Sequence, residues 1–308
     1  MSPLIVALAE LVALTQVRDS YPNASPDGRQ LIFHSNRSGR QAIWVSAADG
    51  ANPRILFDNP ALGSDPGTPV WSPDGLRIAF AMRPAGATDE NESEIYVMSA
   101  DGRDVQRRTH AAGDDSHPHW SADGKRIFFN SARATPDQRA DWTTQWIDIY
   151  SMAMDGSDIR RHTDCRAVCT YPVPSPNGEF VAHRRTLPTA GLNWSQQPIQ
   201  RNSEVFVTAL DGSSSVNVSN SSAYDGWPNW SPDGRWLLFS SNRGQQPNVG
   251  QVHAIRPDGS GIKRLTDGLS KVQPSLSHDG KRLYFYENVE TDKFEIGHIA
   301  SMEISLGE

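Results

Sequence analysis

The sequence has very little cysteine, and this scarcity excludes two classes of protein. Its 308 residues contain only two cysteines, Cys165 and Cys169. Two are too few for a disulfide scaffold, and a zinc site would need a second pair. The short spacing between them is compatible with a small disulfide bridge and equally with two free thiols.

Long apolar runs and an excess of basic charge are also absent. No stretch approaches the roughly 18 apolar residues of a membrane helix, so we expect no membrane insertion. The formal net charge is −7, which gives no broad basic face for nucleic acid. The chain has no nucleophile elbow, Walker loop, dinucleotide fingerprint or His-Glu-x-x-His motif, so no established catalytic motif is present.

A repeated tetrapeptide organises the whole chain. Ser25-Pro-Asp-Gly28 returns five more times with small changes, at intervals of 46 to 56 residues. The other copies begin at Ser72, Ser121, Ser175, Ser231 and Ser277. A fixed period in this range is typical of a repeat protein whose units bury a shared core.

Each unit reads as four short strands. An Asp-Gly or Asn-Gly turn between two apolar runs predicts a tight hairpin, here between strands A and B. A third run rich in β-branched and aromatic residues, such as Ile95-Tyr96-Val97, is strand C, and a second Asp-Gly turn leads to strand D. Six such units predict an all-β, six-bladed β-propeller of four-stranded antiparallel blades.

We expect one domain over residues 1–308, divided into six blades and a closing strand. The expected ranges are 11–15 for the closing strand and 21–58, 69–110, 118–163, 172–219, 228–267 and 274–302 for the blades. The sixth unit lacks a fourth strand after residue 302. Residues 11–15, Leu-Val-Ala-Leu-Thr, match Ile262 to Thr266, so we expect them to pair with the last blade and close the ring.

A signal peptide is the competing interpretation of the apolar N-terminal segment. No Lys or Arg precedes Arg18, and Glu10 interrupts the apolar run, which disfavours a secretory signal. As the chain is written, this predicts a cytoplasmic protein. We take a monomer as the default, because the sequence does not indicate an oligomeric state.

The distribution of loop lengths predicts which face binds ligand. Most length variation falls between strands B and C, whose loops share one face with the D–A connections. The two longest insertions carry tryptophans that resemble a ligand-binding rim: Trp142, Trp146 and Trp194. An alternative interpretation is that these side chains only pack the loops onto the blades.

Polar residues are expected around the mouth of the channel on that face. The candidates at the end of strand B are Arg37, Arg83, Arg133, Arg184, Arg185 and Arg243, and those at the start of strand C are Glu94, Asp148 and Glu204. Arginine suits carboxylate or phosphate ligands, which makes these residues candidate ligand contacts. Alternatively, each arginine pairs with a nearby acidic residue and maintains the repeat.

Residues that break the repeat are the better functional candidates. Tyr171, Trp227 and His117 precede the proline of strand A, as do Tyr21 and Gln273. We single out His117, His183 and Tyr171 as candidate catalytic residues and Trp227 as a ligand contact. His117 is the only candidate metal ligand, because no second histidine has diagnostic spacing.

The repeat resembles that of TolB-type propellers, which are described as WD40-like. The resemblance is carried by Pro69-Val-Trp-Ser-Pro-Asp-Gly75, Pro228-Asn-Trp-Ser-Pro-Asp-Gly234 and Ile262-Lys-Arg-Leu-Thr-Asp267, and it covers residues 11 to 302. It implies a bacterial binding module that holds a peptide, a protein or a small anionic ligand, and a periplasmic location.

The same repeat is also similar to that of oligogalacturonate lyases, which implies an alternative function. In this alternative the chain is a metal-assisted lyase or hydrolase that acts on an acidic saccharide or another small anionic substrate. A divalent metal, Ca or Mn, would then lie in the central channel. His117, Arg133, His183 and Arg243 would serve as base and as partners of the carboxylate.

Overall fold

The Ser-Pro-Asp-Gly segments form the tight turns that the sequence predicts. In the first copy, Ser25 accepts the backbone N–H of Gln30 on its hydroxyl at 2.9 Å and donates that hydroxyl to Asp27 at 2.6 Å. Gly28 has a φ of 70°, a left-handed conformation that a glycine adopts without steric cost. The serine, the acidic residue and the glycine are therefore each required by the turn itself.

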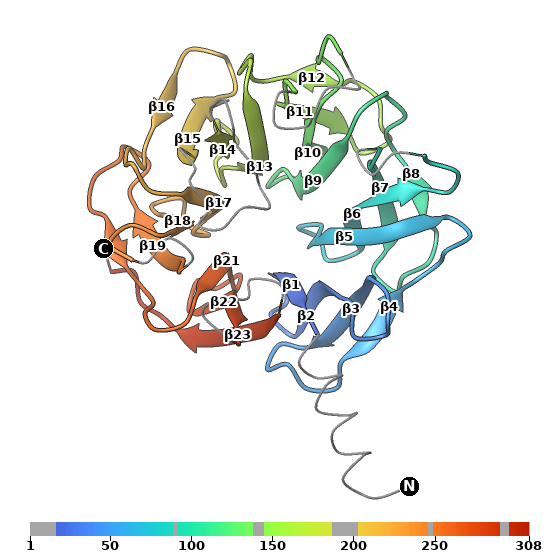
Figure 1. Ribbon diagram of the computed structural model, residues 1–308, viewed down its shortest axis with the longest axis horizontal. Helices are drawn as coiled ribbons and strands as arrows, with labels where there is room; N and C mark the ends of the chain where they lie inside the picture. The colour runs from blue at the N-terminus through green and yellow to red at the C-terminus, as the bar shows by residue number, and fades with distance from the viewer. Residues whose placement is uncertain are drawn as a thin grey trace, which may run out of the picture.

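These turns link strands into six antiparallel sheets arranged around a central axis, as the computed structural model shows (Figure 1). The structure describes residues 17–88, 92–137, 145–186, 203–245, 249–289 and 296–307. Blades 1 to 5 contain four strands each, and blade 6 contains three among these residues. The six-bladed propeller predicted from the sequence is confirmed.

The strands follow one another in chain order from the axis outward in each blade. The bounds in blades 1 to 3 are β1 Asp19–Ala24, β2 Gln30–Ser35, β3 Ala42–Ala47, β4 Arg54–Phe57; β5 Gly63–Trp71, β6 Arg77–Pro84, β7 Glu94–Ser99, β8 Gln106–Arg107; β9 Asp115–Trp120, β10 Arg126–Ser131, β11 Asp148–Ala153 and β12 Arg160–Arg161. Those in blades 4 to 6 are β13 Val168–Pro174, β14 Phe180–Thr186, β15 Ser203–Ala209, β16 Ser215–Asn217; β17 Asp225–Trp230, β18 Leu237–Ser241, β19 Gln251–Ile255, β20 Lys263–Arg264; β21 Lys271–Leu276, β22 Arg282–Asn288 and β23 Gly297–Glu303.

The apolar core lies between successive blades rather than within one blade. One cluster joins Ile32 and Phe57 of blade 1 to Trp71 and Phe80 of blade 2. Similar clusters join blades 2 and 3, blades 3 and 4, blades 4 and 5, and blades 5 and 6. Each blade thus covers the next, which is why the repeat cannot be stable as a single unit.

The tetrapeptide also packs the turns of adjacent blades against each other. A Cβ placed on Gly75 would lie 3.7 Å from the ring of Pro26, and one on Gly124 would lie 3.7 Å from Pro73. At Gly178 nothing lies within 4 Å, and the preceding blade has Ala122 where the others have proline. The Pro and Gly of the repeat therefore meet across blade boundaries.

The ring closes where the described N-terminal residues meet blade 6. Gly297 donates its backbone N–H to the carbonyl of Val17 at 3.2 Å, and Arg18 forms a parallel bridge with Gly297. Parallel bridges at Ile147–Val168 and Ser203–Tyr224 connect other blades in the same way. The closing strand expected at residues 11–15 lies outside the described residues.

Candidate functional site

Six residues, one from each blade, form a ring around the axis in an unusual backbone conformation. Each immediately precedes the proline of strand A and has a positive φ. The members of this axial ring are Tyr21 (56°), Thr68 (49°), His117 (53°), Tyr171 (58°), Trp227 (51°) and Gln273 (57°). A left-handed conformation is costly for a residue other than glycine, at about 1 kcal/mol or more each.

The left-handed residues lie in irregularities of the A–B pairing. In blade 1 the register shifts between Ser20 and Asn23, and in blade 4 it shifts between Thr170 and Val173. The bulge leaves the backbone N–H of the ring residue without its usual ladder partner. That N–H is accepted instead by a side chain of strand B in the preceding blade.

The acceptor of strand B differs among the blades but keeps one role. His34 Nδ1 accepts the N–H of Thr68 at 3.3 Å, and Ser240 Oγ accepts that of Gln273 at 3.0 Å. Asn130 Oδ1 accepts the N–H of Tyr171 at 3.4 Å. Three different residue types are therefore equivalent, because each supplies an acceptor at the same place.

The axial ring closes the channel through contacts between distant blades. Tyr21 and Tyr171 come from blades 1 and 4, which lie on opposite sides of the ring in Figure 1, and their hydroxyl oxygens are 3.4 Å apart. The indole N–H of Trp227 donates to the Tyr21 hydroxyl at 3.3 Å. The rings of His117 and Tyr171 have centroids 4.1 Å apart.

Arg184 adds a buried positive charge beside the ring. This residue, in the B-strand position occupied by Asn130 in blade 3, is only 5% exposed. Its guanidinium carbon lies 4.6 Å from the centroid of Tyr171, and it donates to the Tyr224 hydroxyl at 3.1 Å. A Cβ on Gly226 would lie 3.1 Å from Arg184 Cδ, so the glycine leaves room for this side chain.

A cavity of about 100 Å³ lies along the axis next to the ring. It is lined by the ring residues, by the prolines that follow them and by the next residue of each strand, such as Asn23, His119 and Asn229. Those residues lead toward the Ser-Pro-Asp-Gly turns. The axial ring therefore separates this cavity from the face that carries the B–C and D–A connections.

Burial keeps the two histidines near the axis uncharged. It lowers the pKa of His117 to about 3, and the positive charge of Arg184 lowers it further. Burial likewise lowers the pKa of His34 to about 3. The Tyr21 hydroxyl has a pKa raised well above its ordinary value, because it is buried and faces Tyr171.

The arginines predicted to line the mouth form ion pairs with the start of strand A in their own blade. Arg133 contacts Asp115 at 2.7 Å and Arg243 contacts Asp225 at 2.8 Å, while both carboxylates are fully buried. Arg37 pairs with Asp19 in the same way. The partner of Arg83 is Asp65, whose side chain is 56% exposed.

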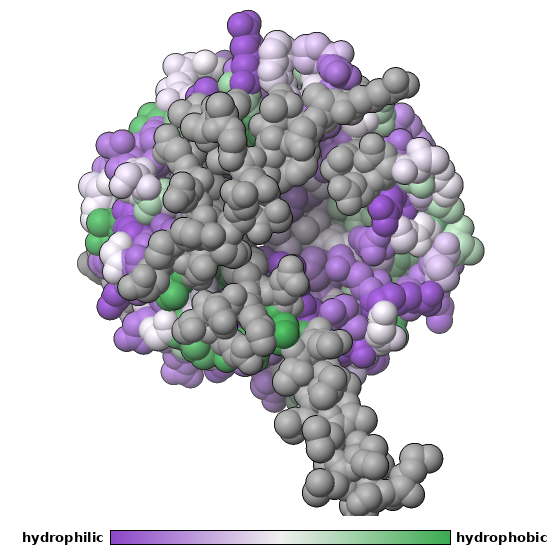
Figure 2. Space-filling view, in the orientation of Figure 1, coloured by the Kyte–Doolittle hydropathy of each residue, from purple (hydrophilic) through white to green (hydrophobic). Residues whose placement is uncertain are grey.

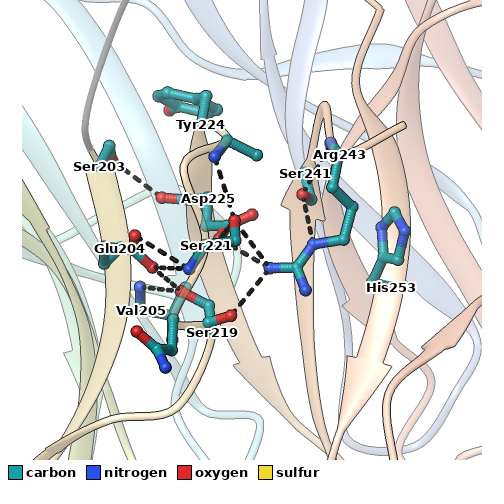
Figure 3. A network of polar contacts seen from close by, with 12 residues as sticks. Ser203, Glu204, Val205, Ser219, Ser221, Tyr224, Asp225, Ser241, Arg243 and His253 are labelled. Atoms are coloured by element: carbon teal, nitrogen blue, oxygen red, sulfur yellow. Dashed lines mark hydrogen bonds and ion pairs between the residues drawn. The ribbon is translucent and has the colours of Figure 1, made fainter. Parts of the chain in front are cut away.

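The acidic residues of strand C bond to the outer strand or to the connection that follows it. Glu94 contacts Arg107 at 2.5 Å, and Asp148 contacts Arg161 at 2.7 Å. Glu204 accepts the hydroxyl of Ser219 at 2.6 Å, close to the Arg243–Asp225 pair, as Figure 3 shows. Burial raises the pKa of Glu204, and it raises that of Asp115 to about 6.

The remaining candidates lie away from the axial ring or outside the described residues. His183 bonds to Thr208 at 3.0 Å within blade 4, and burial lowers its pKa to about 4. Arg185 donates to the carbonyl of Cys165 at 3.2 Å. Trp146 donates its backbone N–H to Thr135 at 3.0 Å. Trp142 and Trp194 lie outside the described residues.

The structure settles the state of the two cysteines, which the sequence left open. Cys165 and Cys169 form a disulfide in the connection from blade 3 to blade 4. Both residues are buried and belong to the apolar cluster between these blades. The bridge therefore lies within a blade interface.

Thr68 is a member of the axial ring that the sequence analysis missed. Its position before Pro69, in the segment that ends with the second tetrapeptide, was the available signal. Its small side chain gives it none of the aromatic character of Tyr21 or Trp227, so composition alone did not mark it.

Metal and membrane sites were searched for among the described residues. Within these ranges, no group of three His, Cys, Asp or Glu side chains is placed to hold a metal ion. The described part of the chain also contains no helix long and apolar enough to cross a membrane. In Figure 2 the surface over blades 1 and 2, at the lower right, is mostly hydrophilic.

Comparisons with known proteins agree with this fold. The family described as TolB beta propeller domain matches residues 61–188. An uncharacterised protein of Agrobacterium fabrum, Atu1656, is 29% identical over 215 residues, which are 68% of this chain and 65% of that protein. The Tol-Pal system protein TolB of Anaeromyxobacter dehalogenans is 36% identical over 100 residues, or 32% of this chain and 21% of that one.

A solved structure gives the same architecture. The crystal structure of TolB from Acinetobacter baumannii superposes with a TM-score of 0.62 at 19% identity, over 84% of this chain and 57% of that one. At this identity the similarity shows the fold alone. The chain spans less than two thirds of each of these relatives, so their activities and partners do not transfer with the fold.

Proposed function

The chain is a six-bladed β-propeller of the TolB type, and we propose that it is a binding module that holds a peptide segment or a small anionic ligand. The proposed site is the mouth of the channel on the face of the B–C and D–A connections, with the axial ring as its floor. A named relative, the Tol-Pal system protein TolB, belongs to a protein system, which supports a peptide or protein as the partner.

The observation that carries the proposal is the strained axial ring. Six left-handed residues, of which Tyr21, His117, Tyr171 and Trp227 are aromatic, meet at one level of the channel. Backbone strain persists where the surrounding structure enforces it and gathers at ligand sites. A propeller that needed only a filled axis could use unstrained apolar side chains.

Arg184 supplies the chemistry for an anionic group. Its backbone pairs with Thr170, which precedes the left-handed Tyr171, so the guanidinium lies on the mouth side of the ring. It lies against the Tyr171 ring, where a planar guanidinium keeps its edge for a carboxylate. Trp227 and Tyr171 offer apolar surface beside this charge, which suits a peptide end with a side chain.

Catalysis on an acidic saccharide is the weaker proposal. A general base works best with a pKa near the working pH, and burial lowers that of His117 to about 3. His183 bonds to Thr208 and stacks on Phe206, within blade 4. No metal-holding group of side chains occurs in the described ranges. These observations favour binding over the metal-assisted lyase or hydrolase.

A ligand screen with matched arginine variants tests the proposal. The probes are short acidic peptides with a free C-terminal carboxylate, the same peptides amidated, and trigalacturonate with and without Mn²⁺. We expect the free-carboxylate peptides to stabilise the folded protein in a thermal-shift assay. Arg184→Gln should weaken that binding about tenfold or more, because a charge-assisted hydrogen bond is lost.

Arg185→Gln is the matched control, because Arg185 follows in the same strand but donates to Cys165. It should leave peptide binding unchanged, whereas Trp227→Ala should reduce it. Equal binding by both arginine variants would show that the mouth is not the site. Release of an unsaturated sugar from trigalacturonate in the presence of Mn²⁺ would replace the binding module with the lyase.

A further inference from the structure

Blade 6 differs from the other five at its outer edge. Its third strand, β23, is the last strand of its sheet among the described residues, whereas each other blade adds a fourth. Of the seven residues of β23 only Gly297 is buried, while all five residues of the equivalent β19 are buried. The backbone edge of β23 is thus the one exposed third strand in the described part of the ring.

A cavity replaces the apolar cluster at the boundary between blades 6 and 1. Each other pair of successive blades shares a cluster of buried apolar residues. Between blades 6 and 1 there is instead a cavity of about 290 Å³, whose lining includes Leu31, Phe33, Gly50 and Ile299. The described residues leave this boundary underfilled.

The glycine of the second turn identifies what the cavity lacks. In blades 2 and 3, a Cβ on Gly102 or Gly156 would lie 2.4 Å from Leu56 O and 2.5 Å from Arg108 O, respectively. Both carbonyls belong to the outer edge of the preceding blade. The equivalent Gly50 has nothing described within 4 Å, and it lines the cavity. The space beside Gly50 therefore corresponds to a fourth strand of blade 6.

Four blades show how such a strand is held. The second or third residue of strand C donates its N–H to a hydroxyl that follows the fourth strand, at 2.9 Å in each case. The pairs are Ile95–Thr109, Ile149–Thr163, Val205–Ser219 and Val252–Thr266. The residue before each hydroxyl returns its N–H to the same strand-C carbonyl, as Leu265 does to Val252 at 2.8 Å.

Blade 6 has the strand-C half of this pattern. Ala300 pairs with Phe285 as His253 pairs with Phe239, so Ile299 is equivalent to Val252. We infer that residues 11–15 of this chain occupy the free edge of β23, with the Thr15 hydroxyl accepting the Ile299 N–H and the Leu14 N–H donated to the Ile299 carbonyl. The sequence Leu14-Thr15 repeats Leu265-Thr266.

The position of the described N-terminus supports this occupant. Val17 already contacts Gly297, the first residue of β23. Thr266 precedes the ring residue Gln273 by a short connection, and Thr15 precedes Tyr21 by one that is a residue shorter. Leu14 would supply apolar surface to the cavity, as Leu265 does to the cluster between blades 5 and 6.

Amide hydrogen exchange on the full chain tests the inference residue by residue. The Ile299 amide should be protected to an extent similar to the Val252 amide. Thr15→Val should speed exchange at Ile299 by roughly fivefold to tenfold, as loss of one hydrogen bond implies, and leave Val252 unchanged. Thr266→Val is the matched control and should have the reverse selectivity.

Two results would overturn the inference. One is an Ile299 amide that exchanges at the rate of an unprotected amide in the unmodified protein. The other is a protected Ile299 amide that responds neither to Thr15→Val nor to Leu14→Asp, because a different strand, such as one from a second copy, would then cover the edge. The selectivity between Ile299 and Val252 keeps either result distinct from general unfolding.

Discussion

Two sets of polar and aromatic residues surround the axis, and they differ in how faithfully the repeat preserves them. The Arg–Asp pairs of blades 1, 3 and 5 are nearly identical, and in each the guanidinium also lies over a phenylalanine of strand B. The axial ring has five different residue types at six equivalent positions. The same backbone site is therefore chemically uniform in one set and variable in the other.

The difference separates residues that build a blade from residues that distinguish one blade from another. Arg133 and Asp115 join the start and the end of one hairpin, a task that recurs in the other blades. Tyr21 and Tyr171 meet across the axis, a contact that no blade makes alone. We therefore expect substitutions in the first set to lower stability and substitutions in the second to alter binding.

The largest expected effect comes from removing the cation of a buried pair. Arg133→Ala leaves Asp115, whose side chain is fully buried, without its partner. Breaking such a pair costs about 3–5 kcal/mol, because an uncompensated charge remains in the interior. Urea unfolding monitored by tryptophan fluorescence measures the change.

Arg83→Ala is the control for that experiment. Asp65 is 56% exposed, so water replaces the lost partner and the cost should stay below about 1 kcal/mol. If Arg133→Ala destabilises the protein no more than Arg83→Ala does, the repeated pairs do not hold the blades. The arginines of the mouth would then return as ligand contacts.

The sequence predicted the blades because the turn requires each of its residues. Ser25, Asp27 and Gly28 satisfy the backbone of a single hairpin, so the pattern is local and visible in one copy. The ion pairs had a local signal too, because Asp115 and Asp225 lie 18 residues before Arg133 and Arg243. The analysis counted arginines from the turn and did not count back to these aspartates.

The axial ring could be predicted only in part. The proline of strand A marked five of its positions, but neither the left-handed backbone nor the bulge has a composition signal at Tyr21 or Trp227. The contact of Tyr21 with Tyr171 joins residues 150 apart in sequence. It depends on the number of blades and on how each strand A is tilted, which a single repeat does not encode.

A smaller effect is expected from the histidine that supports the ring. Burial lowers the pKa of His34 to about 3 from 6.5, so the folded protein takes up this proton less readily than the unfolded chain. Above pH 6.5 the imidazole is neutral in both states, and stability is lost as pH falls from 6.5 toward 3. By pH 5 this one group should cost about 2 kcal/mol.

His34→Asn should remove that loss and keep the acceptor, because Asn130 already fills the equivalent role in blade 3. We expect the variant to gain stability relative to the parent as pH falls from 7 to 5 in urea unfolding. Asp115 acts in the opposite direction below pH 6 in both proteins and cancels from the comparison. His278→Asn, at an exposed position, should show no such gain; equal behaviour of the two variants would contradict the assignment.

The smallest effect tests whether the ring stores strain. Thr68 is β-branched, has a φ of 49° and keeps a buried hydroxyl with no hydrogen-bond partner among the described residues. Thr68→Gly relieves that conformation at the cost of about 0.5–1 kcal/mol of backbone entropy, so stability should rise by about 1 kcal/mol or less. Thr170→Gly, at a buried strand position without a positive φ, should lower stability by a similar amount. Urea unfolding of the two variants decides the matter: if both lose stability, Thr68 is comfortable where it lies, and the ring holds its shape through packing rather than against its own backbone.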